Sequence, residues 1–225
     1  MISNGTMGFS IIIPSRSSQN LKACVEAIRD EDFVNIYVVD DGLSIGARFY
    51  ASPAKILRGD QPFCFSRNVN IGIQAAHPHD VVILNDDAIL KTNNGFKKLE
   101  AATKDHPEYG VIAASTNNVG NPNQRHQAKG LREEGRMVCF ICVYVPRSTI
   151  KRVGMLDERF KPGMFEDDDY CLRTRRIGLK IGVDDDCFVD HQSLHSTMRQ
   201  DPEAAAQCFR QNRERFIQKH GSFPL

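Results

Sequence analysis

The most informative segment of this 225-residue chain is Gly154-Met-Leu-Asp-Glu-Arg-Phe160, followed by Phe165-Glu-Asp-Asp-Asp-Tyr-Cys-Leu-Arg-Thr-Arg-Arg-Ile-Gly178. Acidic residues are favoured in the first turn of a helix and glycine just past its end, so we predict a helix over about 166–177. Capping needs only one or two acids, and four adjacent carboxylates repel one another. The run 166–169 therefore indicates a chemical role in addition to capping the N-terminus of the helix.

Upstream of this segment, short apolar runs alternate with helical spacing. Strands are expected at 9–13, 35–39, 54–57, 81–84 and 110–115, and helices over 19–30, 65–76 and 93–105. Downstream we expect a strand in the apolar run 137–145, a helix near 147–153, strands near 180–184 and 187–190, and a helix over 202–219. This order predicts an α/β fold with βαβ units and a mixed, mostly parallel, Rossmann-like sheet flanked by helices.

Polar clusters follow two of these strands, Asp40-Asp41 and Asn85-Asp86-Asp87. Ligands of parallel sheets bind outside the carboxyl ends of the strands, where both clusters fall. The turn after Ile13, Pro14-Ser-Arg-Ser-Ser18, has neither a dinucleotide fingerprint nor a phosphate-binding loop, so phosphates would need a metal held on carboxylates. Helix capping by these acids is the alternative.

The composition of the chain argues against several classes of protein and of binding partner. Lys and Arg (29) almost balance Asp and Glu (28), a net charge of +1 that argues against nucleic acid as a partner. The longest apolar run is far short of a membrane span, so no transmembrane segment is expected. Seven scattered cysteines and the lack of a signal-peptide pattern favour a cytoplasmic protein. The basic C-terminal helix leaves peripheral membrane contact and oligomer formation open.

Five segments in a fixed order carry a family resemblance. Besides the segment quoted first, they are Ser10-Ile-Ile-Ile-Pro14, Tyr37-Val-Val-Asp-Asp-Gly42, Ser66-Arg-Asn-Val-Asn-Ile-Gly72 and Ile83-Leu-Asn-Asp-Asp87. Together they resemble the family 2 glycosyltransferases, which have the GT-A fold, over roughly residues 9–195. The resemblance implies one domain over 1–225, with a nucleotide-sugar-binding half at about 9–115, an acceptor-binding half at about 137–195 and a C-terminal helix at 200–220.

The resemblance also implies a nucleotide-sugar site. Asp40 would bind the base, and the other residues of this set are Pro14, Ser15, Arg16, Arg67, Asn68, Asn85 and Asp86. Two alternatives stay open: Asp40 serves only its Asp-Asp-Gly turn, or Arg67 makes a structural ion pair instead of a phosphate contact.

Metal and catalytic roles follow from the same resemblance. Asp87 is the expected ligand of Mn²⁺ or Mg²⁺, and Asn85 departs from a strict two-aspartate metal motif. His191, or less directly His195, would add a ligand near the diphosphate, with a structural histidine as the alternative. Asp167 is the expected general base and Glu166 would orient the acceptor.

Asp169 is expected to pair with Arg173, one helical turn away. The triplet Asp184-Asp185-Asp186 is expected to form a solvated turn, and the polar segment 116–136 a long loop that folds over bound donor.

The implied function is that of a metal-dependent inverting glycosyltransferase of glycan biosynthesis. It would move a sugar from a nucleotide diphosphate sugar, with UDP sugars favoured, to a hydroxyl acceptor such as a glycan. A non-catalytic nucleotide-sugar binding domain is the alternative. A sugar-phosphate nucleotidyltransferase is weaker still, because the glycine-rich loop it needs after the first strand is missing.

Overall fold

The computed structural model describes residues 8–44, 54–192 and 201–222. Its strands are β1 (Phe9–Ser15), β2 (Asn35–Asp40), β3 (Lys55–Arg58), β4 (Asp80–Leu84), β5 (Ala88–Leu90), β6 (Tyr109–Thr116), β7 (Leu131–Glu133), β8 (Cys142–Val145) and β9 (Lys180–His191). Its helices are α1 (Ser18–Ala27), α3 (Phe65–Ala75), α4 (Gly95–Asp105), the 3-10 turn η1 (Pro122–Gln124), α5 (Arg147–Val153), α6 (Glu166–Arg176) and α8 (Pro202–His220).

The described strands form one mixed sheet in the order β3-β2-β1-β4-β8-β6-β9-β5, with β7 also paired to β9. β3, β2, β1 and β4 are parallel neighbours, so their carboxyl ends share one edge. β8 runs antiparallel between β4 and β6, and β6 is parallel to β9. The predicted α/β class with a mixed sheet is confirmed.

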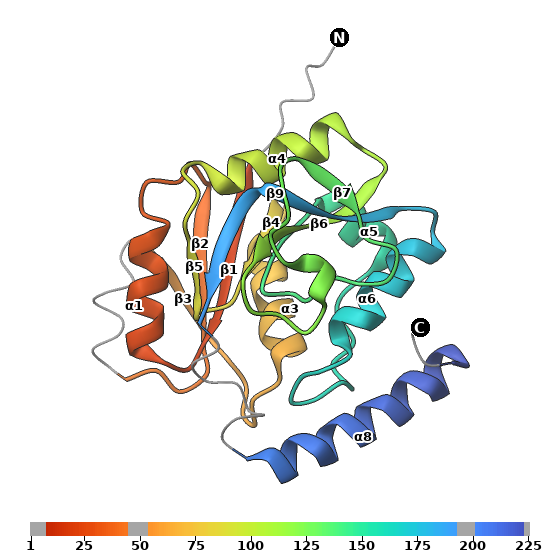
Figure 1. Ribbon diagram of the computed structural model, residues 1–225. Helices are drawn as coiled ribbons and strands as arrows, with labels where there is room; N and C mark the ends of the chain where they lie inside the picture. Colours follow the sequence, from red (N-terminus) through yellow and green to blue (C-terminus); the bar gives the residue numbers. More distant parts are fainter. Residues whose placement is uncertain (1–7, 45–53, 193–200, 223–225) are drawn as a thin grey trace.

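Helices cover both faces of the sheet, with α1 and α4 on one and α3, α5 and α6 on the other (Figure 1). The strand period of two divides β1 between them: Ile11 and Ile13 pack with α1, whereas Ile12 packs with α3. Gly72 of α3 lies directly over Ile12, where a β-carbon would clash with the isoleucine side chain. This close approach seats α3 on the strand that leads to the candidate site.

Two regions differ from the sequence-based expectation. The segment 116–136 contains η1 and β7, because Arg132 forms an ion pair with Asp185 and β7 pairs with β9. The two late strands are one strand, β9, whose register on β6 shifts between Asp184 and Phe188. The prediction of a solvated turn at 184–186 is therefore wrong: Asp184 and Asp185 are buried within β9, and only Asp186 is exposed.

The last helix lies outside the layered body, along α6 and the turn before it (Figure 1). Its contact is a small aromatic cluster in which Phe216 packs against Phe160 and Phe165. Among the described residues, no helix combines the length and apolarity needed to cross a membrane.

Candidate functional site

The carboxyl ends of β1, β2 and β4 bring three sequence motifs together. Ser15, the last residue of β1, pairs with Asp40, the last residue of β2. The Ser15 hydroxyl donates a 2.6 Å hydrogen bond to Asp86 Oδ2, just beyond β4. Burial raises the pKa of Asp86, and this hydrogen bond opposes the rise. Asp40, Ser15 and Asp86 thus lie at one edge of the sheet, as parallel strands require.

A cavity of about 690 Å³ lies beside Asp40 between the ends of β2 and β3, lined also by Leu57, Arg58 and Gln61. Asp40 Oδ1 accepts hydrogen bonds from the backbone amides of Gly42 and Leu43, at 2.9 and 2.8 Å. Asp40 therefore shapes the turn, as the alternative expected, and it also lines a cavity where a base could bind.

Arg16 is exposed beyond β1 and lies over the ring of Phe63, 5.0 Å from its centroid. Pro14 is buried and pairs with Val39 in the sheet. Burial raises the pKa of neighbouring Asp41, against the opposing charge of Arg16. Of residues 14–16, which are predicted to line the nucleotide pocket, Arg16 has the side chain most exposed to solvent.

Helix α3 connects the nucleotide half to the segment 154–160. Arg67 donates to Glu158 Oε2 at 3.4 Å, so the ion-pair alternative for this arginine is met. Asn70 donates to the other oxygen of Glu158 at 2.9 Å and to the Leu156 carbonyl at 3.0 Å. Asn68 is fully buried beside Gly59, beneath the edge of the sheet. Nucleotide contacts by Arg67 and Asn68 stay predictions.

Asp87 and His191 meet because β5 pairs with β9 in antiparallel register, which places Ala88 opposite His191. His191 Nε2 lies 3.3 Å from Asp87 Oδ1, and its Nδ1 lies 2.7 Å from the Asn118 carbonyl. A carbonyl only accepts, so Nδ1 carries a proton and Nε2 is the nitrogen directed at Asp87. Burial lowers the pKa of His191, but the bonds to Asp87 and Asn118 outweigh it and the net shift is upward.

This pair suits a divalent metal. Backbone fixation of one imidazole nitrogen is the usual way in which a ligating histidine is oriented, and carboxylate with imidazole suits Mn²⁺ better than Mg²⁺. Among the described residues, no three His, Cys, Asp or Glu side chains converge on one point. Asp87 and His191 are the two described side chains of these types that meet here. His195 lies outside the described residues.

The acidic run 166–169 begins α6 after a sharp turn, in which Met164 and Phe165 both have positive φ angles of 74° and 72°. Left-handed backbone at two consecutive non-glycine residues is strained and is found where surrounding contacts enforce it. The turn directs the side chains of Glu166 and Asp167 into a cavity of about 300 Å³ that Asn85 also lines. The predicted acceptor residues and one residue after β4 therefore face the same space.

The four acids have different environments. Burial raises the pKa of Glu166 well above its usual range, with a contribution from Asp167. Burial, together with Asp168, raises the pKa of Asp167 to about 7. Burial also raises the pKa of Asp168, although Arg136 lies 3.7 Å away and opposes it.

Asp169 does not line the cavity and has ion-pair partners of its own. It is fully buried and paired with Arg173 at 2.8 Å, which confirms the predicted pair. Lys219 and His220 of α8 reach its other oxygen at 2.5 and 2.7 Å. Asp169 therefore joins α6 to α8, and the acids left for chemistry are those at 166–168.

The contribution of α8 to this cavity was not predicted from the sequence. Ala205 and Cys208 line the 300 Å³ cavity, and Asn212 is buried with its amide on the turn at 163–164. The signal was present, since Ala205, Cys208, Asn212 and Phe216 recur at helical spacing and form one face. An asparagine inside such a stripe indicates a buried polar contact. Residues Cys139, Phe140 and Ile141, expected in a strand, line the cavity instead.

A family model described as glycosyl transferase family 2 matches residues 10–177. No curated protein gave a significant sequence match. The fold is similar to that of solved glycosyltransferases. GalNAc-T7 with UDP, GalNAc and Mn²⁺ has a TM-score of 0.70 and 11% identity, over 84% of this chain and 44% of that one.

Mannosyltransferase PcManGT from Pyrobaculum calidifontis, with GDP-Man and Mn²⁺, has a TM-score of 0.69 and 16% identity, over 96% of this chain and 65% of that one. TarS from S. aureus has a TM-score of 0.64 and 16% identity, over 81% and 36%. The chain thus spans between 36% and 65% of the length of these structures. Identities this low establish likeness of fold, here GT-A.

Proposed function

Because this chain belongs to glycosyl transferase family 2, we propose that it transfers a sugar from a nucleotide diphosphate sugar to a hydroxyl group of an acceptor, with inversion at the anomeric carbon. The observation that most directly supports this proposal is the cavity that Asn85, Glu166 and Asp167 line together. It lies between the strand edge proposed for the donor and the turn before α6, where donor and acceptor would meet.

Asp167 is the proposed general base. A pKa of about 7 leaves its carboxyl group partly ionised near neutral pH, which suits a group that accepts a proton in the transition state. It would take the proton of the acceptor hydroxyl while that oxygen bonds to the anomeric carbon. The bond from this carbon to the diphosphate oxygen breaks on the opposite face, and the nucleoside diphosphate leaves with the bonding electrons.

Glu166 would orient the acceptor. Its buried carboxyl group has a strongly raised pKa, which favours the protonated form, and Oε2 has no hydrogen-bond partner among the described residues. A protonated carboxyl group can donate to one acceptor oxygen while its carbonyl oxygen accepts from another. A buried polar atom without a protein partner is suited to a substrate contact.

Asp87 and His191 would hold Mn²⁺ or Mg²⁺, with Mn²⁺ preferred because of the imidazole. Such an ion supplies positive charge that offsets the charge on the departing diphosphate. The Asn118 carbonyl keeps His191 Nε2 directed at this position, and the Ser15 hydroxyl holds Asp86 beside it. Asp40, Arg16 and the cavity at the ends of β2 and β3 would receive the nucleoside.

A screen of UDP, GDP and dTDP sugars, with and without Mn²⁺, tests the proposal. We expect metal-dependent thermal stabilisation by one class of donor, and the sequence favours UDP sugars as that class. We also expect slow hydrolysis of the donor in the absence of acceptor. Donor binding without hydrolysis or transfer to any glycan would support the binding-domain alternative instead. The cytoplasmic location stays a prediction, checked by cell fractionation.

A further inference from the structure

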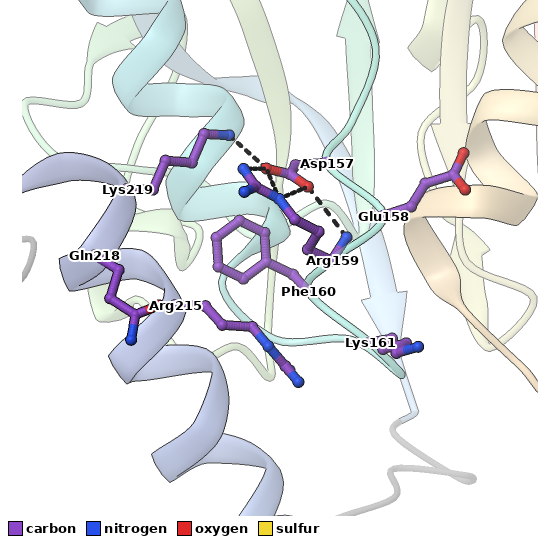
Figure 2. Close-up of a pocket in the computed structure, with 8 residues that line it drawn as sticks. All are labelled: Asp157, Glu158, Arg159, Phe160, Lys161, Arg215, Gln218 and Lys219. Atoms are coloured by element: carbon purple, nitrogen blue, oxygen red, sulfur yellow. Dashed lines mark hydrogen bonds and ion pairs between the residues drawn. The ribbon is translucent and has the colours of Figure 1, made fainter.

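A third cavity lies beside the chain segment that precedes the turn before α6. Its volume is about 580 Å³, and its walls are the segment 157–161 and the C-terminal half of α8 (Figure 2). Four of its lining residues are cationic, namely Arg159, Lys161, Arg215 and Lys219, against two acids, Asp157 and Glu158. The cavity therefore has a surplus of positive charge.

Both acids are already neutralised by partners. Asp157 binds Arg159 at 2.6 Å and Lys219 at 2.7 Å, and these bonds hold its pKa well below the usual range, with burial opposing. Glu158 is directed away from the cavity, towards Arg67 and Asn70 of α3 (Figure 2). Neither carboxylate is left to compensate a further cation.

Lys161 and Arg215 make up the surplus. Neither has a carboxylate partner among the described residues, and Arg215 donates a 2.5 Å hydrogen bond to the Asn212 amide oxygen. Arg215 extends from α8 towards the segment that carries Lys161 (Figure 2). Two cations on opposite walls, with Gln218 as a further donor, form a concave site of the kind that binds phosphate oxygens.

This site and the proposed acceptor cavity are separate cavities that adjoin the same chain segment. Lys161 lines one and the next residue, Pro162, lines the other. Along α8, Cys208 and Arg215 are seven residues apart, so they lie on the same face, separated by about 10 Å along the helix axis. A single extended ligand can therefore place a hydroxyl group near Asp167 and an anionic group near Arg215.

We propose that this cavity binds a phosphate group carried by the acceptor, a monoester or diester of a glycan. The assignment to the acceptor rests on the proposed transfer reaction, whereas the phosphate site itself rests on Lys161 and Arg215. The concave walls, contributed by two separate segments of the chain, favour a single phosphate group over a flat anionic membrane surface.

The test is an NMR titration of the whole ¹⁵N-labelled chain with glycerol phosphate, in EDTA and without nucleotide sugar. We expect saturable shifts confined to residues 157–161 and 215–219, and none with glycerol. Arg215→Gln and Lys161→Gln should each weaken binding about tenfold, since each removes one charge-assisted contact. Lys161→Gln is the safer variant, because it removes no protein contact found among the described residues. Arg210→Gln, the same change on the same helix outside the cavity, should bind like the parent chain.

Shifts elsewhere, unchanged affinity in both variants, or no binding would overturn the proposal. Binding to phosphatidylglycerol vesicles, lost in the same variants, without binding of glycerol phosphate would overturn it in favour of a membrane surface. The titration contains neither donor nor metal, so its failure is independent of the donor screen. If it succeeds, phosphorylated glycans should be better acceptors than their dephosphorylated forms.

Discussion

The side-chain amide of Asn212 donates a 2.7 Å hydrogen bond to the carbonyl oxygen of Gly163. The same nitrogen lies 3.1 Å from the carbonyl of Met164, and the whole residue is buried. The last helix thus holds the strained turn that directs Glu166 and Asp167 into their cavity. Asn212 therefore holds the backbone of this turn although it does not itself line the cavity.

Asn212→Ala should separate this positioning from donor binding. Two carbonyl groups lose their donor, so we expect a loss of about 1–3 kcal/mol in unfolding free energy, measured in urea. The kcat of transfer should fall because the turn relaxes, while the Kd of the nucleotide stays near the parent value. Gln211→Ala, at an exposed neighbour, is the control. An unchanged kcat in a destabilised Asn212→Ala chain would restrict this residue to a structural role.

Asp167→Asn tests the proposed base. We expect kcat to fall between about 100-fold and about 10,000-fold, the usual contribution of a general base, with nucleotide affinity retained. In the parent chain the rate should rise with pH through about 7, as the carboxyl group ionises. That rise should be absent from the residual rate of the variant. Asp168→Asn, which alters the neighbour held near Arg136, should lower the rate much less; equal losses would contradict the assignment.

The same residue should make stability depend on pH. Its pKa lies near 3.8 when unfolded and about 7 when folded, so between these values the folded state holds more protons. Stability from this group is therefore lost as pH rises from about 4 to about 7. Asp167→Asn removes this loss, so the variant should unfold at a higher temperature than the parent at pH 8, with a smaller difference at pH 4. A parent chain that matches the variant at both pH values would show that the carboxyl group is not perturbed.

Removal of the proposed metal ligands should act on donor binding through Mn²⁺. His191→Gln and Asp87→Asn should each raise the Mn²⁺ concentration for half-maximal donor binding by at least about tenfold. EDTA should reduce both variants and the parent to the same weak binding. His106→Gln, at an exposed histidine, should leave the Mn²⁺ requirement unchanged. Identical Mn²⁺ curves in all chains would place the metal elsewhere.

Gly72 should tolerate no side chain. Gly72→Ala places a methyl group against Ile12, so we expect a loss of about 1–3 kcal/mol in unfolding free energy. Gly135→Ala meets no atom within 4 Å and should lose far less. Calorimetry on the two variants measures the difference, and a similar loss in both would show that α3 can shift without cost.

Local patterns predicted most of the layered body. The apolar run at 9–13 and the spacing of Val69, Ile73 and Ala76 each indicated an element that the structure contains. The merging of two expected strands into β9 could not be predicted, because a register shift depends on the partner strand β6. β7 was missed for the same reason, since its pairing involves residues about fifty positions away.

The candidate site divides in the same way. Motifs placed Asp86 and Asp167 at element ends, where the structure has them. The meeting of Asp87 with His191 needed the pairing of β5 with β9, which no local pattern contains. The packing of Asn212 on the 163–164 turn was missed because it joins two segments almost fifty residues apart.

The placement of α8 has a consequence for how such a chain can diverge. The helix begins after residue 177, where the family match ends, and it contacts the turn before α6 and lines the cavity beside Asp167. Substitutions along its inner face can therefore alter what enters beside Asp167 while the donor edge remains intact. Under the proposed transfer reaction, exchange of this single helix would change the acceptor and keep the donor.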